Sequence, residues 1–111
     1  MKLLKNPKKS LGQNFLIDQN IIKKIINQTN IEGENIVEIG PGYGSLTDQI
    51  IRKNPKTLII IEKDLEIFEF LKKKFKDQKK IKIINYDALK YDFSKLKNIK
   101  IISNLPYNIS T

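Results

Sequence analysis

The sequence predicts an α/β fold with a partial parallel sheet of about four strands. Three observations lead to this prediction. Short apolar runs rich in isoleucine recur along the chain, helical patterns lie between the first three runs, and a glycine-rich turn follows the first. Unbroken apolar runs are typical of strands buried on both faces of a parallel sheet. Their alternation with helices is typical of a doubly wound α/β domain.

Each element has its own signal. Isoleucines on one face predict a helix from Asp18, its N-cap, to about Gln28. Leucine, isoleucine and phenylalanine at spacings of three and four predict helices from Ser45 to Lys53 and from Asp64 to Lys76. The segment from Tyr86 to Asn98 is compatible with a short helix or an irregular loop. The four strands are expected at Ile36–Ile39, Leu58–Ile61, Ile81–Ile84 and Ile99–Ile102.

The length of the chain predicts one domain or part of one. With 111 residues there is room for a single core. We expect a basic N-terminal arm over residues 1–17 and the N-terminal part of the α/β domain over 18–111. Because the fourth strand would then lie on an open edge of the sheet, the chain reads as incomplete.

The amino-acid composition indicates which classes of binding partner to expect. A net charge of +9 and a pI near 9.7 favour a polyanion such as nucleic acid or an anionic membrane surface, although lysines also simply keep small domains soluble. The chain has no cysteine and no histidine, which argues against disulfides and against a metal site. The longest apolar runs span four residues, and no signal-peptide pattern follows the basic start. We expect a cytoplasmic protein without a membrane partner.

The glycine-rich turn is the first candidate site. Gly40, Gly42 and Gly44 lie between a strand and a helix, where glycines let the backbone turn tightly and approach a ligand. Glu62, 22 residues after Gly40, ends the second strand, where a carboxylate can accept both ribose hydroxyls of a nucleoside cofactor. Glu38 precedes the turn and could face a cationic group.

Two cofactors use such a site. The dinucleotide fingerprint is G-x-G-x-x-G, whereas this turn reads G-x-G-x-G after an acid. The spacing therefore favours S-adenosyl-L-methionine over NAD. A tight turn without a ligand remains the structural alternative.

Two further segments follow strands, and we expect them at the same edge of the sheet as Gly40 and Glu62. Asp87 could accept a hydrogen bond from a cofactor adenine, or only cap a turn. Asn104 and Leu105 offer a side-chain oxygen and a carbonyl that could draw the hydrogens of an exocyclic amine out of plane. Pro106 would stiffen this turn, and Tyr107 could stack on a flipped base. By itself the segment is better explained as a strand followed by a turn; its position beside a cofactor site reverses that preference and favours catalysis.

Together these segments resemble the ribosomal RNA adenine N(6)-dimethyltransferase family. The resemblance rests on Lys9 to Leu16, the loop from Val37 to Thr47, Glu62, Asp87 and Asn104 to Thr111, and it covers nearly the whole chain. Two motifs, G-Q-N-F-L and N-L-P-Y-N-I-S-T, resemble the housekeeping small-subunit enzymes more than their macrolide-resistance relatives, which modify the large subunit.

The resemblance implies a Rossmann-like methyltransferase fold. It implies that Asn14 and Leu16 touch the donor and that the Gly40 loop holds its methionine end. Glu62 would bind the ribose, Asp87 the donor adenine, and Asn104 would lie between donor and target amine. The implied function is dimethylation of two adjacent adenines of small-subunit (16S) rRNA in the pre-30S ribosomal particle, by a monomer, during ribosome biogenesis.

Other functions stay open at this point. A non-catalytic RNA-binding or assembly module of the same fold is a second possibility. It is supported by the basic arm and by the segment from Lys72 to Lys82, which contains seven lysines and one acidic residue. A large-subunit rRNA adenine methyltransferase and a nucleotide-dependent oxidoreductase are further alternatives. Donor binding, methyl transfer and NAD binding separate them.

Overall fold

A computed structural model describes residues 19–103 of the chain, and of residues 19–22 only the backbone. The predicted arm over 1–17, the predicted cap Asp18 and the segment 104–111 lie outside this part. The elements in chain order are α2 (Gln19–Gln28), β1 (Asn35–Ile39), α3 (Ser45–Arg52), β2 (Thr57–Glu62), α4 (Leu65–Lys74), β3 (Ile81–Asn85), the 3-10 turns η1 (Ala88–Lys90) and η2 (Phe93–Lys95), and β4 (Ile99–Ser103).

The four strands form one parallel sheet, as the sequence predicts. Their order is β3-β2-β1-β4, so β1 and β2 lie in the centre. Val37 pairs with Ile59 on one side and with Ile101 on the other. Within the described residues, β4 forms one edge of the sheet, where the sequence places it.

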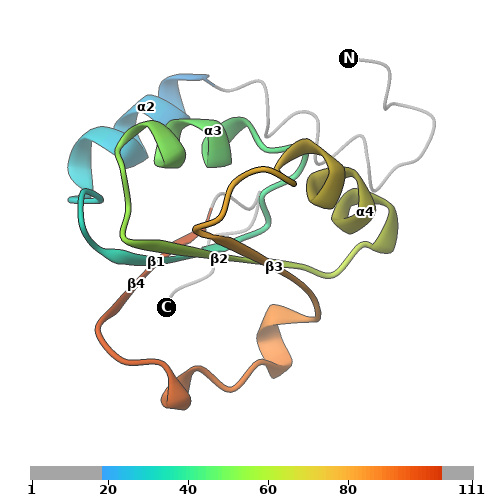
Figure 1. Ribbon diagram of the computed structural model, residues 1–111. Helices are drawn as coiled ribbons and strands as arrows, with labels where there is room; N and C mark the ends of the chain where they lie inside the picture. The colour runs from blue at the N-terminus through green and yellow to red at the C-terminus, as the bar shows by residue number, and fades with distance from the viewer. Residues whose placement is uncertain (1–18, 104–111) are drawn as a thin grey trace.

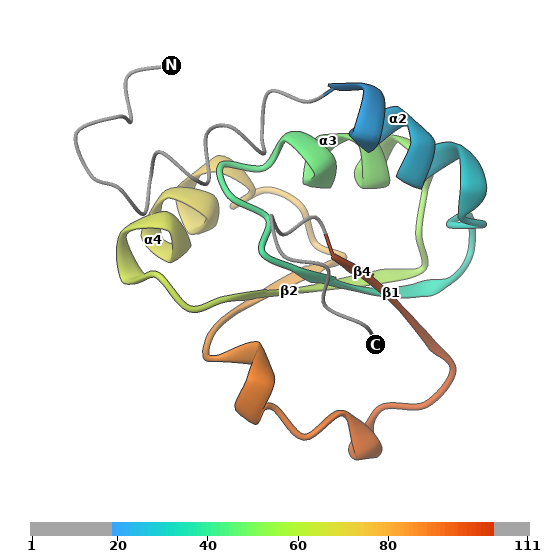
Figure 2. The same ribbon diagram turned by 180° about the vertical axis from the view of Figure 1, so that it is seen from behind.

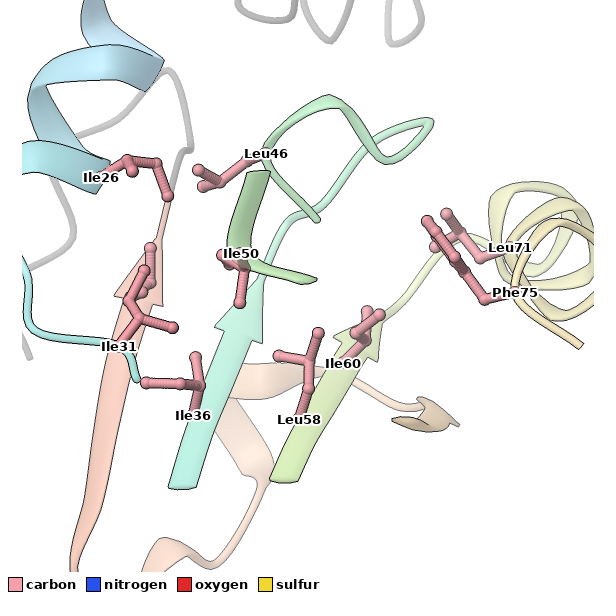
Figure 3. Close-up of a cluster of buried hydrophobic side chains, with 10 residues drawn as sticks. Ile26, Ile31, Ile36, Leu46, Ile50, Leu58, Ile60, Leu71 and Phe75 are labelled. Carbon is pink, nitrogen blue, oxygen red and sulfur yellow. The ribbon is translucent and has the colours of Figure 1, made fainter. Parts of the chain in front are cut away.

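The helices cover one face of the sheet and the two 3-10 turns lie on the other (Figures 1 and 2). Unbroken isoleucine runs suit this arrangement because the central strands are covered on both sides. The cluster on the helix face is drawn in Figure 3, and the one on the other face is centred on Val37, Ile39 and Ile61. The buried residues of the helix-face cluster are Ile26, Ile31, Ile36, Leu46, Ile50, Leu58, Ile60, Leu71, Phe75 and Ile102.

The prediction that each strand is buried on both faces was wrong for β3. Lys82 and Asn85 are exposed, because β3 is an edge strand and the turns after it cover only part of that face. The predicted helix ends were close. Asp64 is the N-cap of α4, where its carboxylate accepts from the Ile67 amide at 3.0 Å, but the helix ends at Lys74 rather than Lys76.

The segment from Tyr86 to Asn98, left open by the sequence, contains η1 and η2. Asp87 caps η1 and Asp92 caps η2, each accepting from an amide two residues on. Tyr91 and Phe93 pack beneath the central strands, which explains why a segment without a long helix covers this face. Among the described helices, none is long and apolar enough to cross a membrane.

Candidate cofactor site

The carboxyl ends of the four strands meet at one edge of the sheet. Ile39 pairs with Ile61 and with Ser103, and Glu62 pairs with Asn85, so the loops that follow β1, β2 and β3 share this edge. Open parallel sheets bind their ligands there. The structure thus brings together Gly40, Glu62 and Asp87, as predicted. The other predicted site residues, Asn14, Leu16, Asn104, Leu105, Pro106 and Tyr107, lie outside the described residues.

The glycine turn needs glycine for its backbone conformation. Gly40, Gly42 and Gly44 have φ values of 69°, 58° and 97°, in the left-handed region that side chains disfavour. A Cβ on Gly44 would lie 2.9 Å from Lys74 Nζ and 3.1 Å from the Phe75 ring. The turn is therefore shaped both by its own glycines and by the helix packed against it.

That helix is α4, and it holds the turn through Lys74. The Lys74 ammonium donates to the Tyr43 carbonyl oxygen at 3.0 Å and to Asp48 Oδ2 at 3.1 Å. The Tyr43 ring meets Phe70 of the same helix edge-on, with 4.9 Å between centroids. This contact could not be predicted from the sequence, because Lys74 is one of many lysines in its segment.

Glu38 is fully buried just before the turn. Its Oε1 accepts from the Thr47 hydroxyl at 2.5 Å, whereas its Oε2 has no hydrogen-bond partner among the described residues. Burial raises the pKa of Glu38 to about 8; Asp48 and Glu62 act in the same direction, and the Thr47 hydrogen bond and Lys74 act against it. A buried oxygen without a partner costs about 1–3 kcal/mol, so this position suits a ligand that brings a donor, above all a cationic one.

Glu62 ends β2 and is 8% exposed. Its Oε2 accepts from the Asp64 amide at 2.8 Å, which fixes the orientation of the carboxyl group. Its carbonyl oxygen accepts from the Asn85 side chain at 3.0 Å and from the Tyr86 amide at 3.1 Å. The ends of β2 and β3 are thus tied together beside the glycine turn.

Asp87 is half-buried and already has one structural task. Its Oδ1 accepts from the Leu89 amide at 2.9 Å, which is the turn-capping role that the sequence left open. The loops of this edge also expose large apolar side chains that the sequence did not single out: Leu65 is 60% exposed, Tyr86 47% and Leu89 80%. Leu65 directly follows Asp64, and Tyr86 and Leu89 lie within two residues of Asp87. Such groups can cover the flat faces of a base. In residues 19–103 no three His, Cys, Asp or Glu side chains are grouped to hold a metal ion.

The chain is similar to known proteins over most of its length. Residues 4–111 match the family described as ribosomal RNA adenine dimethylase. The chain is 50% identical over 106 residues to ribosomal RNA small subunit methyltransferase A of Pelagibacter ubique, covering 94% of this chain and 40% of the relative. It is 44% identical over 110 residues to the protein of that name from Sulfurihydrogenibium sp., covering 95% of this chain and 43% of the relative.

The chain is also similar to a solved structure. The crystal structure of a dimethyladenosine transferase from Plasmodium falciparum is similar with a TM-score of 0.70 and 29% identity, over 84% of this chain and 34% of that chain. The predicted Rossmann-like methyltransferase fold is confirmed. The chain spans less than half the length of these relatives.

Proposed function

Because the chain belongs to the ribosomal RNA adenine dimethylase family, we propose that it forms the cofactor-binding part of an rRNA adenine N(6)-dimethyltransferase. The reaction would move methyl groups from S-adenosyl-L-methionine to the exocyclic amines of two adjacent adenines in small-subunit (16S) rRNA. The names of the relatives from Pelagibacter ubique and Sulfurihydrogenibium support the small subunit over the large one.

The buried Glu38 carries this proposal. Its Oε2 has no partner among the described residues, at the edge where Gly40 and Glu62 also lie. The ammonium group of a methionine moiety supplies both the donor and the positive charge that this oxygen lacks. The residues present therefore fit the cofactor, whereas a dinucleotide would bring a pyrophosphate toward a buried carboxyl group.

Each site residue would bind a different part of the cofactor. Glu38 and the turn around Gly40 to Gly44 would hold the methionine end, Glu62 the ribose hydroxyls and Asp87 the adenine amine, with the side chains of Leu65 and Leu89 beside the base. S-adenosyl-L-methionine supplies an activated methyl group on its sulfonium sulfur. The low exposure of Glu38 and Glu62 strengthens each hydrogen bond that they accept, because water is excluded.

The predicted catalytic segment remains part of the proposal. Asn104 follows β4 directly in the chain, and β4 ends at the edge where the cofactor residues lie. The Asn104 amide oxygen and the Leu105 carbonyl would accept the two amine hydrogens of the target adenine. This orients the nitrogen lone pair toward the methyl group, while Pro106 fixes the turn and Tyr107 stacks on the flipped base. Asn14 and Leu16 would touch the donor.

Calorimetric titration with S-adenosyl-L-methionine tests the proposal, with NAD as the control ligand. We expect the chain to bind the methyl donor and not NAD, and Glu62→Ala to weaken donor binding. Binding of NAD alone would replace the proposal with an oxidoreductase. Binding of rRNA without any donor would replace it with the non-catalytic RNA-binding module. The monomeric state, the cytoplasmic location and the pre-30S ribosomal particle as partner belong to the same proposal.

A further inference from the structure

The amino ends of the strands form a second edge, opposite the cofactor site. Three backbone hydrogen bonds join the loops there: Gly33 N to Asn54 O at 3.0 Å, Lys56 N to Glu34 O at 2.8 Å and Leu58 N to Lys80 O at 3.0 Å. The loops before β1, β2 and β3 are therefore one continuous surface. At about 3.3 Å per residue, strands of this length separate it from the cofactor edge by roughly 15–20 Å.

This surface, which we name the amino-edge surface, is strongly basic. Seven cations lie on it against three carboxylates. The cations are Arg52, Lys53, Lys56, Lys76, Lys79, Lys80 and Lys100, and the carboxylates are Glu32, Glu34 and Asp77. At the opposite edge the charges nearly balance, with Glu62, Asp64 and Asp87 against Lys63, Lys74 and Lys90. The charge is thus concentrated away from the cofactor residues.

Two of these lysines are held by neutral oxygens. Lys80 Nζ donates to Asn54 Oδ1 at 3.1 Å and to the Pro55 carbonyl at 3.4 Å, and Lys100 Nζ donates to the Asn30 carbonyl at 3.0 Å. A neutral acceptor fixes the ammonium group without cancelling its charge. Lys74, at the glycine turn, is instead paired with Asp48. The fixed lysines at the amino edge thus keep their full charge for a partner.

A cavity of about 270 Å³ opens on the same surface, between α3, β2 and the loop before β3. Both apolar and polar side chains line it. The apolar residues are Ile51, Pro55, Leu58 and Ile81, and the polar ones are Asn54, Gln78, Lys79 and Lys80. A nucleic acid that lies across this cavity would have its phosphates beside Lys79 and Lys80.

We propose that the amino-edge surface is a second RNA-contact surface, which binds the phosphodiester backbone of the substrate RNA away from the reacting adenine. The inference rests on the proposed function, since it takes RNA as the substrate. Phosphates fit the fixed cations because each contact releases condensed counterions. A contact of this kind positions the RNA and carries no base sequence information.

The test compares two triple variants of the chain with equal loss of charge. One variant removes exposed lysines of the surface (Lys53→Gln, Lys56→Gln, Lys79→Gln), and the control removes exposed lysines of the helices (Lys23→Gln, Lys24→Gln, Lys73→Gln). A fluorescent transcript of the 3′ region of small-subunit rRNA is titrated at several salt concentrations. Polyglutamate serves as a competitor without bases or phosphates, and calorimetry with S-adenosyl-L-methionine is run on every protein.

We expect the surface variant to bind the transcript roughly ten-fold or more weakly at 0.1 M salt, with a salt slope about 2 smaller, at about 0.7 per lost phosphate contact. A matching Lys→Arg triple variant should bind as the unchanged chain does. Equal losses in the surface and control variants, or displacement of the RNA by polyglutamate, would overturn the inference in favour of unspecific charge attraction. Donor binding is independent of these variants, so its absence in the unchanged chain would contradict the proposed function instead.

Discussion

Lys74 Nζ lies 3.0 Å from the carbonyl oxygen of Tyr43, so a side chain near the end of α4 fixes the backbone of the glycine turn. The same ammonium group pairs with Asp48 of α3, the helix that begins directly after the turn. One cation therefore joins three parts of the cofactor edge. Since a ligand binds best to a site that is already in its bound shape, this contact should contribute to cofactor affinity.

Replacing Lys74 tests this contribution. Lys74→Met keeps the aliphatic stem but removes the hydrogen bonds to Tyr43 and Asp48. Because the pair is partly exposed, we expect a loss of about 1 kcal/mol or less, which is roughly three- to five-fold in donor affinity by calorimetry. Lys73→Met, an exposed neighbour on α4, is the control and should leave affinity unchanged. Equal effects of the two substitutions would show that only net charge matters.

Gly44 offers a second test, because it meets two demands at once. Its φ of 97° disfavours any side chain, and a Cβ would also press on the Phe75 ring at 3.1 Å. Gly33 is the matched control, with a φ of 72° and open space around its Cβ position. We expect Gly33→Ala to cost about 1–2 kcal/mol in urea unfolding and Gly44→Ala to cost more. Similar losses of unfolding free energy in the two variants would show that the Phe75 side chain moves aside at little cost.

The sequence was sufficient to predict the strands, the helices and the edge of the sheet at which Gly40, Glu62 and Asp87 lie. Unbroken isoleucine runs require two covered faces, and parallel strands bring the ends of β1, β2 and β3 to one edge whatever the details of packing. Gly40, Glu62 and Asp87 could therefore be placed together from the sequence alone. The exposure of Lys82 could not be predicted from the sequence. It depends on which strand lies at the edge of the sheet, and therefore on the order of the strands.

Contacts between side chains that are distant in the chain could not be predicted from the sequence. The bond from Lys74 to the Tyr43 carbonyl depends on how α4 packs over the turn, and nothing in a run of lysines distinguishes Lys74 from Lys73. The depth at which Glu38 is buried, and its pairing with Thr47, likewise depend on the packing of α3 against β1. Tertiary packing fixed these features, and local sequence patterns carry no trace of it.

Asn104 and Glu62 should separate catalysis from binding. We expect Asn104→Ala to abolish methyl transfer in an enzyme that contains this chain while donor affinity stays nearly unchanged, because it removes an acceptor for the target amine. Glu62→Gln should instead weaken donor binding, since charge-assisted hydrogen bonds contribute about 1.5–3 kcal/mol. Filter assays with labelled donor and calorimetry measure the two effects. Full transfer activity of Asn104→Ala would remove the catalytic assignment.

The buried Glu38 predicts a pH dependence of stability with a defined sign. Its pKa is raised from 4.5 to about 8 in the folded chain, so between these values the folded state holds a proton that the unfolded state has released. The stability from this group is therefore fully present below about pH 4.5 and is lost as the pH rises toward 8, by at most about 1.4 kcal/mol per pH unit.

Glu38→Gln isolates this effect, because the amide cannot ionise and its oxygen can still accept from Thr47. Urea unfolding between pH 5 and pH 8 should show the unchanged chain losing stability and the variant losing markedly less. The groups around Glu38 that bear charge, Asp48, Glu62 and Lys74, are present in both proteins and cancel in the comparison. A saturating methyl donor should flatten the dependence in the unchanged chain alone, because a cationic ligand favours the ionised carboxylate. Parallel pH profiles without ligand would show that Glu38 is ionised in the folded state.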